Sequence, residues 1–513
     1  MKLIRSILTV GGFTVGSRLA GFVREVLTAS LLGAGAASDA LVVAIKLPSF
    51  FRRLFAEGAF NASFVPLFAG LLATEGKDAA RTFAEQIFTL LITILLVLVL
   101  IVELFMPYLL PALVPGFEKT PERLYYAIEF SRVTFPFIFF ISLTALYSGI
   151  LNSFDRFAAV ASSPMVGNLA IIAIVFGLHA QFSSAGYAFA IGVTACGVIQ
   201  WLWVLYPAIK KGMYLRLHRP QMTPQVRKFF VVLGPAAFGS GIVQINLFIG
   251  SWIASWLPTG AISYLNFADR LNQLPLSVIG VAVSTALLPL LSKQIRAGSL
   301  DEASASQNLA LEFSMFLTLP ATLALTLIAH PLVSAVFERG AFGSEDSLST
   351  AYTLMALALG LPAYVLIKVF TTGFFARQDT KTPIYTALAG IVVDIVLSLL
   401  LMGSLKQIGI ALATAAAAWV NALLLGYLLW RKGHLVIENR LLMFFPRLLL
   451  ACLGTGLILE GLNDILAPFY EGGELMRASA VMGLVITGLA AFFIQAYLLK
   501  IARFHDYKGR FAS

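Results

Sequence analysis

Residues 17–60 read SRLAGFVREVLTASLLGAGAASDALVVAIKLPSFFRRLFAEGAF. Five cations stand in this stretch among residues that are otherwise typical of lipid-embedded helices: Arg18, Arg24, Lys46, Arg52 and Arg53. Each cation at bilayer depth costs about 2.5–3.5 kcal/mol on insertion scales. A chain that accumulates several of them needs a wet cavity for them to face. The stretch therefore predicts a membrane protein with a cationic cavity that binds an anion.

The whole chain has the composition of a polytopic membrane protein. Of its 513 residues 59% are hydrophobic and only 12% are charged, and the mean hydropathy is +0.88. Soluble domains carry about 25% charged residues. At about 20 residues per span, we expect an all-α fold of about fourteen transmembrane helices. We place them at 7–33, 36–58, 86–109, 124–150, 157–178, 185–206, 226–256, 261–291, 306–337, 349–375, 383–403, 407–430, 445–463 and 476–499.

Basic residues are distributed unequally between the two sides of these spans. Of the 36 lysines and arginines, 23 lie in the termini and even-numbered loops, 5 in the odd-numbered loops and 8 within spans. The positive-inside rule then predicts that both termini are cytoplasmic. A basic face toward anionic membrane lipids accounts for the net charge of +10, so nucleic acid is not an expected partner.

An internal repeat runs through the chain at an offset of about 225 residues. Phe135-Pro136 recurs as Leu361-Pro362, and Gly149 with Asp155 recurs as Gly373 with Asp379. The offset spans six helices, which predicts two pseudo-symmetric six-helix lobes around a central cavity. We expect an N-terminal lobe at 1–220, a C-terminal lobe at 221–435, and two extra helices with a cytoplasmic tail at 436–513.

Helix 2 carries charged residues at helical spacing. Asp39, Lys46 and Arg53 are seven residues apart, and Glu57 follows four residues later. Seven steps of 100° return to within about 20° of the same face. The pattern predicts a stripe that faces the cavity. The alternative is internal ion pairing, such as Arg53 with Glu57, which would organise the bundle without binding anything.

The second half contributes Asp269 and Arg270 to the predicted cavity. Arginine suits a pyrophosphate because its planar fork donates two hydrogen bonds at once and stays charged. The alternative is that Arg270 pairs with Asp269.

Three further polar residues, Asp394, Asn246 and Thr414, could form a sodium site for coupling. For them the reading as hydrogen-bonded packing groups is favoured, so no metal site is assigned. Motifs of nucleotide loops, metalloproteases and serine hydrolases are missing. We therefore expect neither an enzyme nor a cofactor, and no residue is assigned a catalytic role.

Three segments resemble the MurJ (MviN) family of lipid II flippases: SRLAGFVRE, DALVVAIKLPSFFRRLFAEGAFNASFVPLF and FADRLNQLP. That family belongs to the multidrug/oligosaccharidyl-lipid/polysaccharide exporter (MOP) superfamily. The resemblance implies fourteen helices in two lobes, with the last two forming a groove for a lipid tail. It also implies that Arg18, Arg24, Arg52 and Arg270 are required in the cavity, and that Asp39 lies in a matched motif.

The resemblance further implies a function. The implied substrate is lipid II, an undecaprenyl-pyrophosphate disaccharide-pentapeptide. The implied activity moves it by alternating access from the cytoplasmic to the periplasmic leaflet of the bacterial inner membrane. This transport would serve peptidoglycan biosynthesis, cell wall biogenesis and cell shape. The peptidoglycan synthesis and division machinery is a candidate partner, and we expect a monomer. The alternative is another exporter of this fold, either an O-antigen-type flippase or a multidrug/ion antiporter. The energy source is left open between the membrane potential and sodium.

Overall fold

The computed structural model describes residues 2–52, 59–436, 438–470 and 472–501, without the side chains at 2–8, 59, 236–247, 281, 282 and 284. The chain divides into two compact units. Unit 1 comprises Met1–Ser263 with Arg339–Phe342, and unit 2 comprises Tyr264–Glu338 with Gly343–Ser513. The described residues contain helices and no strand. An all-α membrane fold is thus confirmed.

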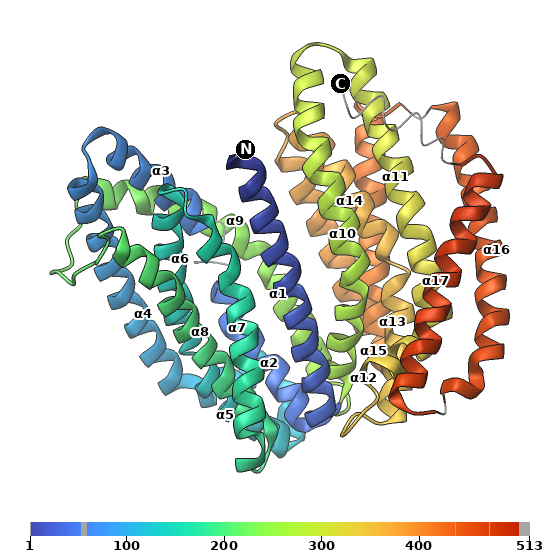
Figure 1. The fold of residues 1–513 in the computed structure, drawn as a ribbon, viewed down its shortest axis with the longest axis horizontal. Coiled ribbons are helices and arrows are strands. Elements are labelled where there is room, and N and C mark those ends of the chain that lie inside the picture. The colour runs from blue at the N-terminus through green and yellow to red at the C-terminus, as the bar shows by residue number, and fades with distance from the viewer. Residues whose placement is uncertain (1, 53–58, 437, 471, 502–513) are drawn as a thin grey trace. The chain divides into compact units, whose positions relative to one another are not determined.

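Unit 1 is a bundle in which α1 packs along α7, α2 along α5, and α8 along α6 and α7 (Figure 1). Its helices are α1 (Lys2–Leu32), α2 (Ala36–Phe51), α3 (Ala59–Thr74), α4 (Lys77–Leu113), η2 (Pro115–Lys119), α5 (Pro121–Thr134), α6 (Phe137–Ser153), α7 (Phe157–Leu178), η3 (His179–Gln181), α8 (Ala185–Lys210) and α9 (Pro224–Ser255).

Unit 2 holds the rest of the chain, and α16 and α17 lie side by side at its edge (Figure 1). Its helices are α10 (Ala261–Arg296), whose first three residues belong to unit 1, α11 (Leu300–Leu327), α12 (Ala329–Phe337), α13 (Ser344–Ala358), α14 (Leu361–Phe375), α15 (Lys381–Arg431), α16 (Asn439–Tyr470) and α17 (Glu474–Leu498).

Proline interrupts two predicted spans at equivalent places of the repeat. The expected span 124–150 is divided into α5 and α6 at Phe135-Pro136, and the expected span 349–375 into α13 and α14 at Leu359-Gly360, directly before Leu361-Pro362. Proline has no backbone N–H and its ring clashes with the preceding turn, so a helix breaks or bends there. The sequence repeat therefore corresponds to a shared irregularity in the two halves.

The predicted spans 383–403 and 407–430 both lie within α15 (Lys381–Arg431). At Lys406 the backbone leaves the helix, with φ 50° and ψ −130°, and Asp394 on one side meets Thr414 on the other. The segment is thus an antiparallel pair of helices with a very short turn, as the two predicted spans require. Within the described residues ten helices are long and apolar enough to cross a membrane, and the number fourteen stays a prediction.

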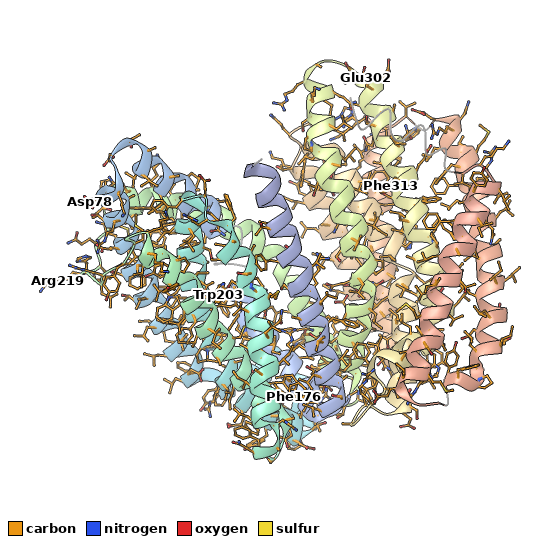
Figure 2. All side chains as sticks on the ribbon, in the orientation of Figure 1. Asp78, Phe176, Trp203, Arg219, Glu302 and Phe313 are labelled. Atoms are coloured by element: carbon orange, nitrogen blue, oxygen red, sulfur yellow. The ribbon has the colours of Figure 1, made fainter. Side chains whose placement is uncertain are left out.

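Apolar side chains cover much of the outside of each unit (Figure 2). On unit 1, Phe176 and Trp203 are 64% and 46% exposed, and on unit 2 Phe313 is 37% exposed. A soluble protein would rarely tolerate so many large exposed apolar residues. In a bilayer such residues face lipid tails, which agrees with the predicted spans.

Two ion pairs attach α16 and α17 to the rest of unit 2. Arg440 Nε lies 3.1 Å from Glu312 Oε1 on α11, and Arg477 Nη1 lies 3.1 Å from Glu338 Oε1 after α12. Phe492 of α17 also packs against the core of the unit.

The boundary between the two compact units lies at Ser263, so α9 belongs to unit 1, whereas the sequence repeat divides the chain near residue 220. The lobe boundaries derived from the repeat stay a prediction.

Candidate functional site

The Arg24 guanidinium is held by two side chains of unit 1. Its Nη1 donates to Asn168 Oδ1 of α7 at 3.1 Å, and its Nη2 lies 2.7 Å from Glu25 Oε1. The Arg24 side chain remains 22% exposed, whereas that of Glu25 is 9% exposed. The helix periodicity places Ser17, Gly21 and Arg24 on one face of α1, and that face packs against α7. Arg24 is thus held at a fixed place without being sealed from solvent.

Arg18 and Arg52 belong to the same unit as Arg24. Arg18 is exposed on α1 and Arg52 is half-buried directly after α2. Arg24 and Arg52 both lie close enough to the buried Cys196 of α8 to act on it electrostatically. The structure therefore brings two of the predicted site arginines to one part of unit 1.

Lys46 keeps the exposure that the stripe on helix 2 predicts. It is exposed, and its Nζ donates to Ser251 Oγ of α9 at 3.1 Å. The residues that the stripe predicts to lie off its face, Leu41 and Leu47, are 2% and 4% exposed. At the level of Lys46, α2 is thus polar on one side and packed on the other.

Asp39 requires a correction, because it does not lie on a wet face. It is 0% exposed and its Oδ2 lies 3.0 Å from Arg123 Nη2 at the start of α5. It also accepts from Gly260 N, Ser263 N and Ser263 Oγ at 2.8, 2.9 and 2.6 Å. The stripe argument fails here because every residue from 38 to 44 is buried. The helical period defines a face, but the first turns of α2 are covered on all sides.

Arg123 completes this buried network, which sequence reasoning missed. It is 1% exposed, donates to Leu257 O at 3.0 Å and lies over the Phe117 ring at 4.2 Å. The predicted spans leave it in the loop between 86–109 and 124–150. An arginine among loop residues gives no signal of a partner 84 positions away.

Three predicted site residues lie outside what the structure describes. Arg53 and Glu57 fall within residues 53–58, and the side chain of Asn246 falls within 236–247. Their roles stay predictions, and so does the alternative of an Arg53–Glu57 pair.

In unit 2, Asp269 and Arg270 lie in the third turn of α10. Asp269 accepts a hydrogen bond from Gln273 Nε2, one turn further along the helix. Arg270 is exposed. Asp269 thus has a partner on its own helix, and a role for either residue in substrate binding stays a prediction.

Asp394 and Thr414 meet across the two arms of α15. Thr414 Oγ1 lies 3.2 Å from Asp394 Oδ1 and donates to Ile410 O at 2.9 Å. Of the three predicted sodium ligands, the structure describes the side chains of Asp394 and Thr414. Over the described residues there is no group of three or more His, Cys, Asp or Glu side chains that could hold a metal.

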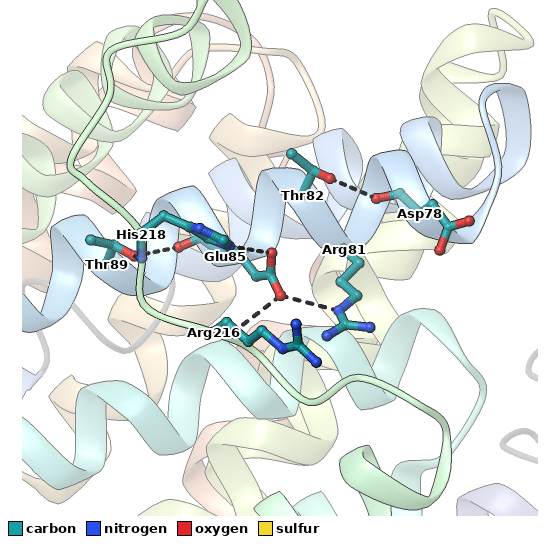
Figure 3. A network of polar contacts seen from close by, with 7 residues as sticks. All are labelled: Asp78, Arg81, Thr82, Glu85, Thr89, Arg216 and His218. Carbon is teal, nitrogen blue, oxygen red and sulfur yellow. Dashed lines mark hydrogen bonds and ion pairs between the residues drawn. The ribbon is translucent and has the colours of Figure 1, made fainter.

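A separate polar network attaches the α8–α9 connection to α4 (Figure 3). Glu85 Oε1 lies 3.1 Å from Arg81 Nε and accepts from Arg216 N, and Glu85 Oε2 lies 2.9 Å from His218 Nε2. His218 N donates to Thr89 Oγ1 at 3.1 Å. This network explains how a basic loop without regular structure stays close to the bundle.

The chain matches the family model described as "Lipid II flippase MurJ" over residues 28–480. It is 43% identical over 507 residues to a probable lipid II flippase MurJ of Rhizobium meliloti, covering 97% of this chain and 94% of the relative. It is 37% identical over 508 residues to one of Rickettsia prowazekii, covering 99% of both.

Solved structures agree with this similarity. A lipid II flippase MurJ in an inward closed conformation superposes with a TM-score of 0.79 at 26% identity, covering 96% of this chain and 98% of that one. A multidrug resistance MATE family transporter of the MOP superfamily gives a TM-score of 0.66 at 15% identity, covering 82% of this chain and 94% of that one. The second likeness concerns the fold alone.

Proposed function

The chain belongs to the lipid II flippase MurJ family, and from this premise we propose that arginines of its cavity hold the pyrophosphate of lipid II during transport. The family membership makes the protein a multi-pass membrane transporter, with lipid II as its substrate. We propose that it acts in the bacterial inner membrane with both termini in the cytoplasm. A catalytic activity is not part of this proposal.

The observation that carries the proposal is the environment of Arg24. Its guanidinium is fixed on two sides, by Asn168 and Glu25, and remains partly exposed. A pre-oriented guanidinium loses less entropy when it binds an anion, and its fork fits the oxygens of a pyrophosphate. Arg18 of the same unit would bind the same pyrophosphate, and Arg52 would guide it from the cytoplasmic side. A contact of the pyrophosphate with Arg270 of α10 is part of the same proposal.

The same-fold alternative of a multidrug or ion antiporter is not favoured. The likeness to such a transporter is at 15% identity, whereas the MurJ relatives match over nearly the whole chain. Among the described residues of the predicted site in unit 1, the charged side chains that are at least partly exposed are cations. An anionic, lipid-linked substrate fits them better than a cationic drug.

We propose that the membrane potential supplies the driving force, with sodium at Asp394 and Thr414 as the alternative. A charge that moves across the full potential is worth about 2.3 kcal/mol per 100 mV. A cationic cavity that becomes neutral when it loads an anion would respond to that potential differently in its empty and loaded states. Replacement of sodium by potassium at constant potential should therefore leave transport unchanged, and a loss would favour the sodium alternative.

The test of the function measures where lipid II accumulates. Cells depleted of the native protein and complemented with Arg24→Ala should fail to grow and should retain lipid II in the inner leaflet. An external, membrane-impermeant hydrolase would then leave that lipid II intact. Arg24→Lys should also be impaired, because the two-pronged donor is lost.

The control for this test is Arg219→Ala, because Arg219 lies exposed in the α8–α9 connection (Figure 2). It should complement fully at equal membrane levels. Normal growth with Arg24→Ala would refute the proposed role of this arginine.

A further inference from the structure

Asn168 connects the side chain of Arg24 to the backbone of α1. Its Oδ1 accepts from Arg24 Nη1 at 3.1 Å, and its Nδ2 donates to Ser17 O at 3.3 Å. A guanidinium can only donate and a carbonyl can only accept. The two contacts therefore fix the orientation of the amide, since a flipped amide would satisfy neither of them.

The packing around Asn168 leaves the amide little freedom. A Cβ atom on Gly21 would lie 3.5 Å from Asn168 Nδ2, so the amide lies directly on the α1 backbone. On the preceding residue, Gly167, a Cβ would come within 2.2 Å of Gln200 Nε2 and 2.6 Å of Cys196 Sγ. α7 is thus held close to α8 on one side while Asn168 reaches α1 on the other.

The contacts of Arg24 use only part of its hydrogen-bonding capacity. A guanidinium has five N–H donors, and Asn168 and Glu25 each take one, on different terminal nitrogens. Among the described residues no further hydrogen bond of this guanidinium is formed. Nε–H and one N–H of each terminal nitrogen are therefore not used by the described residues and could donate to an anionic ligand.

The chemistry of an amide suits this place better than that of a carboxylate. Glu25 already supplies one negative charge to Arg24. A second carboxylate at position 168 would cancel the attraction for an anion and could not donate to Ser17 O. A neutral amide holds the guanidinium in place and leaves its charge unchanged.

We propose that Asn168 is a positioning residue that orients the Arg24 guanidinium for the pyrophosphate of the substrate. This inference rests on the proposed function, since it specifies how one of the site arginines is prepared for binding. Asn168 acts through Arg24 and needs no contact of its own with the ligand.

The test measures the affinity of the purified full-length protein for lipid II in detergent micelles. Without Asn168 the ligand has to immobilise the Arg24 side chain itself, and this cost weakens binding about two- to tenfold. Asn168→Leu removes both contacts at similar volume and should show this loss. Asn168→Asp keeps the acceptor but adds a charge, and it should lose at least as much.

Two comparisons separate positioning from a general effect on folding. Ser162→Ala on the same helix removes the hydrogen bond from Trp203 Nε1 and should leave the affinity unchanged. In an Arg24→Lys background, which lacks the fork, Asn168→Leu should change the affinity no further. A merely structural role would lower the affinity by the same factor in both backgrounds and would overturn the inference.

The failure of the inference and that of the proposed function give different results. If the native protein binds lipid II much better than undecaprenol but Asn168→Leu binds as the native protein does, only the inference is overturned. If the native protein binds lipid II no better than undecaprenol, the pyrophosphate site itself is wrong, and the inference falls with it.

Discussion

Loss of Arg123 should destabilise the protein strongly, because it leaves the Asp39 carboxylate buried without its counter-charge. Arg123 is 1% exposed and Asp39 is 0% exposed. Arg123 Nη2 lies 3.0 Å from Asp39 Oδ2. Removal of one partner from such a buried pair costs about 3–5 kcal/mol. We therefore expect Arg123→Ala to lower the free energy of unfolding by an amount in this range.

The contacts that remain in each variant set the order of the effects. After Arg123→Ala, Asp39 keeps three hydrogen bonds from Gly260 and Ser263, so this variant should lose about 3 kcal/mol. After Asp39→Ala, those donors lose their acceptor, and among the described residues Arg123 keeps Leu257 O as its one acceptor. That variant should lose about 5 kcal/mol.

A pair elsewhere in the same unit provides the control. Arg132 Nη1 and Glu129 Oε1 are 3.7 Å apart, and the two side chains are 43% and 35% exposed. An ion pair of this kind contributes about 0–1 kcal/mol. Arg132→Ala should therefore change the free energy of unfolding little, although the same type of charge is removed.

The free energy of unfolding can be measured by titration with sodium dodecyl sulfate in mixed micelles, followed by far-ultraviolet circular dichroism. The double variant Asp39→Ala/Arg123→Ala should lose less than the sum of the two single losses, by about 1–3 kcal/mol, since the two residues interact directly. The reasoning is refuted if Arg123→Ala loses no more than Arg132→Ala, or if the double variant shows simple additivity.

Two further outcomes follow from the structure. In the α14–α15 connection, the hydrogen bond from Lys432 Nζ holds the pKa of the Asp379 carboxyl well below its usual range. The hydrogen bond therefore stabilises the folded protein above about pH 4, the ordinary pKa of aspartate. This stabilisation is lost as the pH falls further and the carboxylate is protonated. Acid titrations of unfolding should show a weaker pH dependence in Asp379→Asn, and an unchanged curve would contradict this. Cysteine at Lys46 should react with a small polar thiol reagent, whereas cysteines at the buried Leu41 and Leu47 should not. Equal labelling of all three would contradict the described burial.

The sequence predicted the class of the fold because hydropathy is a local property. Every apolar run of sufficient length must cross a membrane or be buried, and its residues are neighbours along the chain. The recurrence of Phe135-Pro136 as Leu361-Pro362 was visible for the same reason, although the spans around both dipeptides were predicted without a break. Proline acts on its own turn, so the structural effect of both dipeptides is local. The short turn at Lys406 agrees with two predicted spans separated by only three residues.

The cationic character of the site was equally visible in the sequence. Charges within apolar helices are costly wherever the helix packs, so Arg18, Arg24, Arg52 and Lys46 could be selected without knowledge of their partners. The motifs around them also identified the family, because a resemblance depends on the order of residues and not on their contacts.

The tertiary structure alone decided which of these charges meets which partner. The helical period gave Asp39 and Lys46 a common face, but the neighbouring helices cover α2 completely at Asp39 and leave it open at Lys46. Arg24 finds Asn168 at a separation of 144 residues, and Asp39 finds Ser263 at 224. Periodicity describes one helix at a time, whereas burial and ion pairing depend on what packs against it. That information lies in the arrangement of several helices and is absent from any single stretch of the chain.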